Sequence, residues 1–191
     1  MTGGEGFDVI RPSGATRVPW ANGRGSTRAL TEDPSRSWRL SLADIDQHAP
    51  FSVLPGIDRI LVVADGEVEL RIDEHVHHLL VGDSVEFHGE SEASAVAVGG
   101  AAHVVNLMTV RGAARFDGQL VGPVREVSAP QADDEILLLL SSGATQEGIE
   151  IEPGSVLRWS SPAADAQRPA VSVIRFAEPI VVYRMRRHSL S

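Results

Sequence analysis

Residues 59–72 read RILVVADGEVELRI and contain the pattern that decides the fold. An apolar run, residues 60–64, ends at Asp65-Gly66, a pair that is typical of a tight turn. Three apolar residues then alternate with charged ones and share one face of an extended segment: Val68, Leu70 and Ile72. The stretch therefore predicts two antiparallel β-strands joined by a turn.

Short apolar segments of the same kind recur on both sides of this stretch. In the first half of the chain, strands are expected at residues 38–44, 59–64, 68–72, 77–80, 85–87, 93–98 and 104–110. A polar, proline-containing stretch, residues 117–134, separates them from a second series. The strands of that series are expected at residues 135–140, 149–151, 156–159, 171–176 and 180–185.

The two series look like versions of one pattern, because residues 59–66 correspond loosely to residues 135–143. Closely spaced short strands with turns between them are typical of small β-barrels. We therefore expect an all-β protein with few short helices. A first barrel with an N-terminal loop would occupy residues 1–120, and a second, smaller barrel, to which N-terminal residues can add a strand, would occupy residues 121–191.

The composition excludes several kinds of chemistry. The chain has 191 residues and contains no cysteine, so it has no disulfides, thiolate metal ligands or cysteine nucleophiles. All 17 basic residues are arginine, which excludes a Schiff-base lysine and the phosphate-binding lysine of a P-loop. A formal net charge of −9 would repel a polyanion, so we expect no nucleic-acid partner.

The sequence contains no stretch that resembles a membrane segment or a secretion signal. Residues 1–19 lack a continuous apolar region, and polar and glycine residues interrupt the longest candidate span, residues 95–108. We therefore expect a cytoplasmic protein without a membrane partner.

The order of strands and turns resembles that of the cupin superfamily of small β-barrels. In that superfamily two histidines and a glutamate of a first motif, and a further histidine of a second motif, hold a metal. In the corresponding register Arg59 stands at the glutamate position, Val53 and Pro55 at the paired histidine positions, and Ala93 near the last histidine. None of these side chains coordinates a metal, so we expect neither a metal nor another cofactor in this barrel.

Three other patterns have alternative interpretations. Residues 74–78 would place His75 and His77 on one face of a strand, as in a Zn or Ni site, but in the cupin register they form an exposed hairpin that points away from the lumen. Residues 82–85 (GDSV) resemble the nucleophile block of a hydrolase family, but the Asp-x-x-His of that family is missing, which favours a simple turn. Residues 22–27 could form a backbone nest for an anion or a flexible loop over the barrel mouth.

Four motifs fall within residues 17–112. They are residues 18–27 (VPWANGRGST), residues 38–43 (WRLSLA), residues 50–59 (PFSVLPGIDR), and Asn106-Leu107-Met108 with Arg111-Gly112. This set resembles the HutD/Ves family of bacterial bicupins, which implies two RmlC-like cupin barrels in one chain. The resemblance also implies a link to histidine catabolism or to a stress response, with a role as a small-molecule-binding regulator of histidine utilisation.

Arg59 is the first candidate for ligand binding. In the barrel register it points into the lumen, where an unpaired guanidinium is costly, so it needs a carboxylate partner or an anionic ligand. Strand alternation places Arg39 and Ser41 on one face, and Asn106 and Met108 likewise share a face. The candidate ligand-binding residues are Arg59, Asn22, Ser41, Asn106, Arg39, Trp20 and Phe51.

Several of these residues also have a purely structural interpretation. Arg59 could form a salt bridge with a neighbouring acid, either Asp58 or Asp44. Trp20 and Phe51 could pack against each other across the barrel mouth rather than stack on a ligand.

Three functions follow as alternatives. The first is a metal-free binding protein for a small carboxylate, such as a formylated or formimino amino acid from histidine breakdown, because arginine matches a carboxylate with two parallel hydrogen bonds. The second is a metal-independent cupin enzyme for a small polar metabolite, whose general acid or base would be Asp44, Asp58, Glu86, His88 or His103. The third is an assembly protein that forms a homodimer through exposed strand edges.

Overall fold

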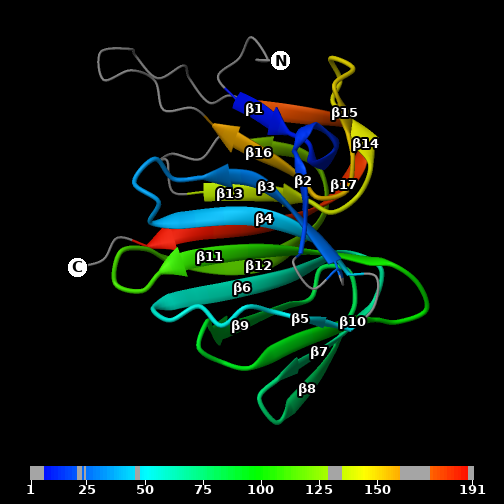
Figure 1. Ribbon diagram of the computed structural model, residues 1–191. Coiled ribbons are helices and arrows are strands. Elements are labelled where there is room, and N and C mark those ends of the chain that lie inside the picture. The colour runs from blue at the N-terminus through cyan, green and yellow to red at the C-terminus, as the bar shows by residue number, and fades with distance from the viewer. Residues whose placement is uncertain are drawn as a thin grey trace.

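The computed structural model of the protein describes residues 7–20, 23, 25–45, 48–128, 135–159 and 173–188 (Figure 1). Apart from a short 3-10 helix at Pro12–Gly14, all the regular secondary structure of these residues is β-strand. Within them, the search for a helix that could cross a membrane finds none that is long and apolar enough. The prediction of an all-β protein is confirmed.

A six-stranded antiparallel sheet lies at the centre of the molecule. Its strand order is β2 (Arg17–Pro19), β3 (Gly25–Glu32), β4 (Trp38–Ile45), β11 (Ala102–Val110), β6 (Ile57–Asp65) and β9 (Ser84–His88). The middle strands carry apolar residues on both faces, which explains why β6 reads as a continuous apolar run rather than as an alternating one. This sheet therefore packs against partners on both sides.

A four-stranded sheet covers one face of the six-stranded sheet, at the bottom of Figure 1. Its order is β5 (Ala49–Pro50), β10 (Ala93–Ala97), β7 (Val68–Ile72) and β8 (His75–Leu79). The alternating residues of β7 supply its apolar face, and Val68 and Leu70 pack with Leu61 and Val63 of β6 in a shared core. We call the space between these two sheets the lumen.

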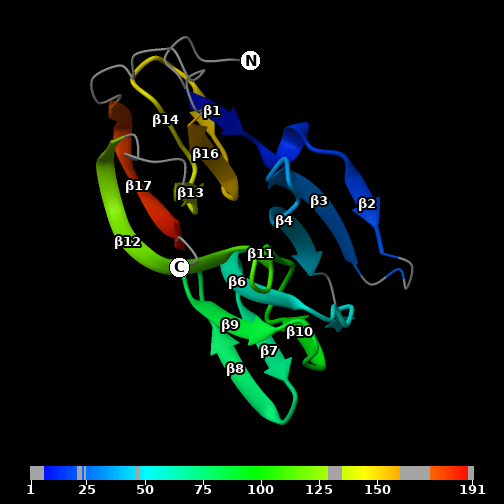
Figure 2. The same ribbon diagram turned by 90° about the vertical axis from the view of Figure 1, so that its left-hand side faces the viewer.

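A five-stranded sheet covers the opposite face, as Figure 2 shows. Its order is β1 (Phe7–Ile10), β16 (Ser155–Trp159), β13 (Glu135–Leu139), β17 (Val173–His188) and β12 (Arg115–Ser128), and the short pair β14 (Gly143–Ala144) and β15 (Glu150–Ile151) accompanies it. Leu138 and Tyr183 of this sheet share a core with Leu40 and Val105 of the six-stranded sheet. We call this the joint core.

The strand order β4-β11-β6-β9 in the central sheet matches the order β12-β17-β13-β16 in the five-stranded sheet. This correspondence supports the expected duplication, although the boundary near residue 120 falls inside β12 and the division into two barrels stays a prediction. The sequence predicted a connecting stretch between the two series from residue 117 onward. That prediction is wrong for residues 117–128, because they belong to strand β12.

Two strands were expected at residues 171–176 and 180–185, of which residues 171 and 172 lie outside the described residues. The described parts of both belong to one continuous strand, β17. The register between β12 and β17 shifts between Val124 and Glu126, opposite the segment that contains Pro179. A bulge of this kind accepts a proline that cannot donate to the ladder, so the chain passes through without turning.

The N-terminal hairpin corrects a second expectation. Residues 25–27, expected in a nest or flexible loop, belong to β3 and lie opposite residues 43–45 of β4, whereas residues 21, 22 and 24 lie outside the described residues. A Cβ at Gly25 would stand 2.8 Å from the Asp44 carbonyl oxygen and 3.1 Å from the Trp20 ring. Glycine is therefore required here by close packing rather than by a turn.

Asp44 links this hairpin to the central sheet through a buried carboxylate that is 4% exposed. Ser26 Oγ donates to it at 2.6 Å, Arg17 Nε lies 2.9 Å away, and Arg28 Nη1 also donates to it. Burial alone would raise the pKa of Asp44, but the hydrogen bonds from Ser26 and Arg28 and the charges of both arginines outweigh it and hold the pKa below its usual range.

Replacing Asp44 with asparagine is expected to lower the free energy of unfolding by about 2 to 3 kcal/mol near pH 7, because the partly buried Arg28 loses its counter-charge. A carboxyl group whose pKa falls on folding stabilises the protein fully above its unfolded pKa, about 4. That contribution is lost as the pH falls through the lower folded pKa. Urea unfolding of both proteins across this pH range measures the difference.

The matched control for this experiment is Asp65→Asn, because the Asp65 side chain is 59% exposed. We expect the control to change stability by no more than about 0.5 kcal/mol. A difference between wild type and Asp44→Asn that stayed constant down to acidic pH would contradict the assignment of the Asp44 pKa.

Candidate functional site

A cavity of about 710 Å³ lies on the lumen face of the central sheet, between β3, β4 and the segment that follows β5. Most of its described lining is apolar or carries neutral polar groups. The charged side chains among the described lining residues are Glu32, Arg39 and Arg59. Apolar walls with a few polar groups directed inward are typical of small-molecule sites.

Strand register explains which side chains reach this cavity. Met108 of β11 lies opposite Arg39 of β4 on one side and opposite Arg59 of β6 on the other. Asn106 lies opposite Ser41 in the same way. Residues directly opposite in neighbouring strands share a face, so these side chains form two adjacent rows on the lumen face. The predicted alternation places them correctly.

Arg59 is buried, with 4% of its surface exposed. Its Nη2 donates to Asn106 Oδ1 at 3.0 Å, and its guanidinium carbon lies 4.8 Å from the centre of the Phe51 ring and 5.0 Å from that of Phe87. Its Nε is buried and has no hydrogen-bond partner. Burial, and secondarily the charge of Arg39, lower the pKa of Arg59 to about 10, so the group remains cationic at neutral pH.

The salt bridge considered for Arg59 is wrong. Asp44 is occupied by Arg17 and Arg28, and Asp58 by His88 at 2.8 Å and Arg111 at 2.8 Å. Among the ion pairs of the described residues, none includes Arg59. The charge is therefore compensated by one amide oxygen and two aromatic rings, and not by an acid.

Trp20 and Phe51 meet at the edge of the cavity. Their ring centres are 6.1 Å apart at an angle of 64°, an edge-to-face contact, and Trp20 Nε1 donates to Thr27 Oγ1 at 2.6 Å. Phe51 also covers the Arg59 guanidinium. Both aromatic residues thus pack in the wall while lining the cavity. Asn22, another candidate, lies outside the described residues.

A charged cluster that the sequence did not predict holds the loop carrying Phe51. Arg111 donates to Glu90 and to the Ile57 carbonyl, and Glu90 Oε1 accepts from the Gly56 backbone N–H at 2.8 Å. The Arg111 and Gly56 hydrogen bonds lower the pKa of Glu90 to about 2. Arg111 belongs to one of the motifs that resemble the HutD/Ves family, and nothing else in the sequence pointed to this role.

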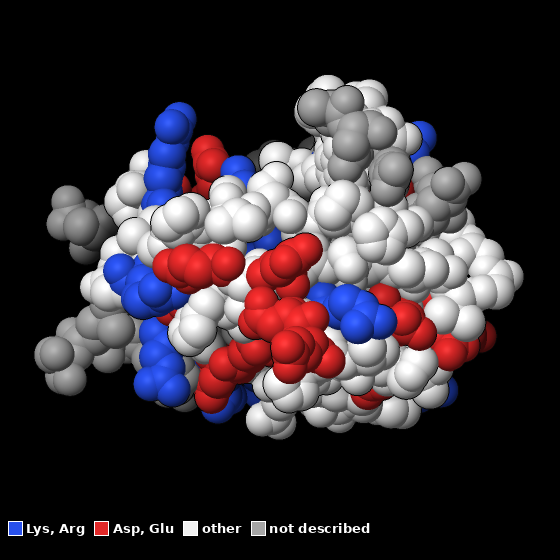
Figure 3. All heavy atoms as spheres, turned by 60° about the horizontal axis from the view of Figure 1, so that its bottom comes forward, with Lys and Arg blue, Asp and Glu red and all other residues white. Residues whose placement is uncertain are grey.

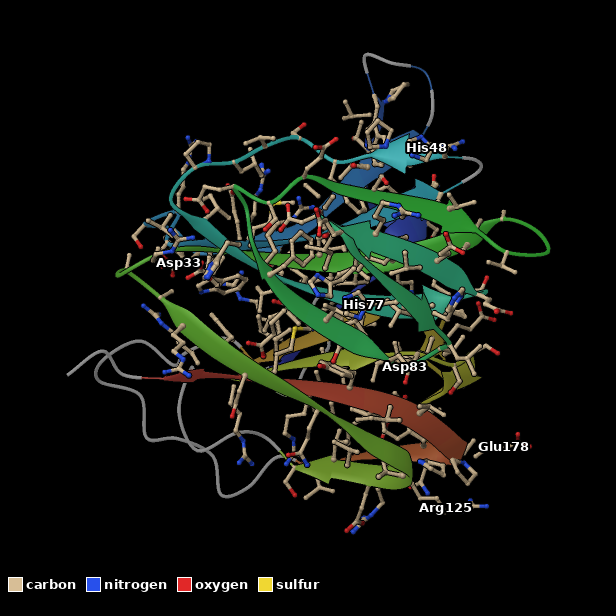
Figure 4. All side chains as sticks on the ribbon, turned by 90° about the horizontal axis from the view of Figure 1, so that it is seen from below. Asp33, His48, His77, Asp83, Arg125 and Glu178 are labelled. Atoms are coloured by element: carbon tan, nitrogen blue, oxygen red, sulfur yellow. The ribbon has the colours of Figure 1, made fainter. Side chains whose placement is uncertain are left out.

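The cupin metal positions contain side chains that do not bind metals. Ala93 is buried in the lumen core, and Val53 is 57% exposed in the loop before β6. Across the described part of the chain, no three His, Asp or Glu side chains are grouped as a metal site requires. Figure 4 shows His48 and His77 well apart.

The histidine-rich segment forms edge strand β8, paired with β7. His77 lies opposite the buried Leu70 and is half-buried, so the expectation that this segment points away from the lumen is wrong for that residue. It lies on the core-facing side of the sheet, beyond the apolar residues.

The residues considered for acid–base catalysis lie elsewhere. None of the described residues lining the 710 Å³ cavity belongs to that set, which was Asp44, Asp58, Glu86, His88 and His103. Asp58, Glu86 and His88 instead line another hollow, of about 650 Å³, which Arg59 also borders. His103 Nε2 lies 3.6 Å from Asp44, beside a third, smaller hollow. The Arg59 cavity therefore gains no general acid or base from this set.

The positive charge of the cavity is a local property. The chain as a whole carries a formal net charge of −9. Figure 3 shows Asp and Glu side chains gathered over the face that forms the bottom of Figure 1. An anion that enters the cavity is thus attracted by particular guanidinium groups and not by the surface as a whole.

The fold and the cavity define a cupin-like β protein with a buried arginine on the lumen face of its central sheet. The chain belongs to the HutD family, whose model matches residues 13–173. An uncharacterized 21.2 kDa protein in the hutC 3′ region of Pseudomonas putida is 36% identical over 109 residues, 53% of this chain and 57% of that protein. Protein Ves of Citrobacter koseri is 32% identical over 99 residues, 48% of this chain and 52% of that protein. The chain spans about half the length of these curated relatives.

Solved structures share the fold over almost the whole chain. A conserved protein of Pseudomonas aeruginosa PAO1 superposes with a TM-score of 0.76 and 25% identity, covering 97% of this chain and 100% of that one. HutD from Pseudomonas fluorescens SBW25, in a formate condition, gives a TM-score of 0.73 at 22% identity, covering 96% of this chain and 100% of that one. The second of these likenesses supports the fold alone.

Replacing Arg59 with methionine is expected to leave the unliganded protein as stable as wild type or more stable by up to about 2 kcal/mol, because a buried charge without an acid partner is removed. The same replacement at Arg28, which pairs with buried Asp44, is expected to cost about 3 kcal/mol. Urea unfolding compares the two variants. A loss at Arg59 as large as that at Arg28 would show that Arg59 is a structural residue.

Protein purified without chelator is expected to contain less than about 0.1 equivalents of Zn, Fe or Ni, because Val53, Pro55 and Ala93 offer no donor atoms in their side chains. Elemental analysis by plasma mass spectrometry measures this content. Stoichiometric metal would contradict the alignment of these residues with the cupin metal positions.

Proposed function

We propose that this protein is a metal-independent binding protein for a small carboxylate, which it holds through Arg59. The observation that carries the proposal is the cationic side chain itself, 4% exposed and without an acid partner in the described chain, on the wall of a cavity. A buried unpaired charge costs several kcal/mol, and an anionic ligand offsets that cost.

The surroundings of Arg59 favour a planar anion. Phe51 and Phe87 restrict the guanidinium, and Asn106 accepts one of its N–H groups. The remaining in-plane N–H groups suit the two oxygens of a carboxylate, which binds guanidinium through parallel hydrogen bonds. Ser41 and Asn106, in the adjacent row, supply neutral polar groups for the rest of the ligand.

Relatives suggest the metabolic setting. One lies in a hutC 3′ region, and another, named HutD, was crystallised in a formate condition. Formate is the smallest carboxylate, and a formylated or formimino amino acid carries a carboxylate together with a formyl or formimino group. We therefore propose that the ligand is an intermediate or product of histidine breakdown and that its binding regulates histidine utilisation.

Formate and soluble histidine-pathway intermediates are expected to raise the melting temperature of the wild-type protein by about 5 °C at saturating concentration, because ligand binds the folded state alone. Arg59→Gln is expected to abolish this shift. Arg71→Gln removes the same charge from the exposed face of β7 and is expected to retain it. Equal shifts in all three proteins, measured by differential scanning fluorimetry, would contradict the proposal, and so would no shift in any.

A further inference from the structure

Two guanidinium groups line the same cavity, and they lie in one row of the sheet. Arg39 and Arg59 lie opposite Met108 on its two sides, so their side chains leave the sheet on the same face. Neighbouring strands are about 4.8 Å apart, which places the two Cα atoms about 10 Å apart across β11. Both side chains border the 710 Å³ cavity.

Neither guanidinium is neutralised by an acid. Arg39 donates to the Met108 sulfur, at 3.4 Å from Nε and 3.3 Å from Nη2, whereas Arg59 donates to Asn106. A thioether is a weak acceptor and an amide oxygen is neutral, so both positive charges remain directed at the cavity. The two charges also act on each other, since Arg39 contributes to the lowered pKa of Arg59.

Glu32 is the acidic side chain among the described lining residues of the cavity. It lies opposite Arg39 in the register of β3 and β4 and borders the cavity. The ion pairs of the described residues do not include one between Glu32 and Arg39, although the register makes them neighbours. Arg39 turns over Met108 instead, toward Arg59.

We propose that the cavity selects a dianion: a short dicarboxylate with one carboxylate on Arg59 and the other on Arg39. This inference rests on the proposed function and extends it, because it assigns Arg39 as the residue that determines specificity for the second charge. A single carboxylate on Arg59 would leave the Arg39 guanidinium with its sulfur contact alone. A second carboxylate at the other end of the ligand replaces that contact with charge-assisted hydrogen bonds.

Three probes of one chain length separate the possibilities. Pentanoate, glutarate and 4-aminobutyrate each join a carboxylate through three methylene groups to a second group, which is neutral, anionic or cationic respectively. Isothermal titration calorimetry at low ionic strength, about 20 mM, keeps the exposed Arg39 charge unscreened. Wild type is expected to bind glutarate at least about tenfold more tightly than pentanoate, the value of one good charge-assisted contact. It should bind 4-aminobutyrate most weakly.

Variants assign this preference to a residue. Arg39→Gln is expected to reduce glutarate affinity to that of pentanoate, so that the preference for the dianion is lost. Glu32→Gln is expected to strengthen glutarate binding, because it removes the acid beside Arg39. Arg71→Gln, on the exposed face of β7, changes net charge by the same amount as Arg39→Gln and is expected to preserve the wild-type preference.

The outcomes separate this inference from the function on which it rests. If wild type binds pentanoate and glutarate equally and Arg59→Gln abolishes both, the cavity binds a monocarboxylate and the dianion proposal is wrong. A preference for 4-aminobutyrate would mean that Glu32 controls the cavity mouth, and would also overturn it. Binding that persists in Arg59→Gln would instead overturn the proposed function itself.

Discussion

Arg59 places a positive charge in the protein interior, with only 4% of the residue's surface exposed to solvent. A charge in such a place is normally matched by an opposite charge, as the buried carboxylate of Asp44 is matched by Arg28 in the same chain. For Arg59 the match is incomplete: two aromatic rings lie beside the guanidinium and one amide oxygen accepts from it. The cavity, the loop that carries Phe51 and the neutral polar row of Ser41 and Asn106 all adjoin this charge, which has no acid partner among the described residues.

The contrast between the two arginines separates stability from binding. The Asp44 cluster joins the N-terminal hairpin to the central sheet and is complete within the described protein. The hydrogen bonding of Arg59, by contrast, is incomplete, since its buried Nε has no partner. Proteins commonly accept a local loss of stability where a ligand supplies the missing interaction. Arg59 fits this description because its Nε is left without a partner, whereas Arg28 is already paired with Asp44.

Most of what the sequence could predict about the candidate site came from the alternation of side chains along the strands. It placed Arg39 with Ser41 and Asn106 with Met108, because side chains in a strand alternate with a period of two whatever their chemistry. The cupin-like register, and not alternation, directed Arg59 into the lumen. Alternation failed where packing overrides local signals. Gly25 looked like part of a loop, but its lack of a Cβ serves close packing against Trp20 and Asp44.

Other features depended on chain paths that no local pattern reveals. Arg111 reaches Glu90 and Ile57 across 21 and 54 residues of sequence, so the support of the Phe51 loop emerges only once β6, β9 and β11 are assembled. The occupancy of Asp58 by Arg111 and His88 was hidden for the same reason, and with it the isolation of Arg59.

Both faces of the central sheet are covered along most of its middle strands. In β4, Leu42 packs into the joint core while its neighbour Ala43 packs on the lumen side, and in β6, Val62 and Val63 divide in the same way. In a strand with one face toward solvent, every second side chain is exposed and its residue type can vary. Here consecutive buried residues pack alternately on the lumen side and in the joint core. Sequence change in this family should therefore be slowest along these strands and should accumulate at the sheet edges, so that drift alters the rim of the molecule before it reaches the binding wall.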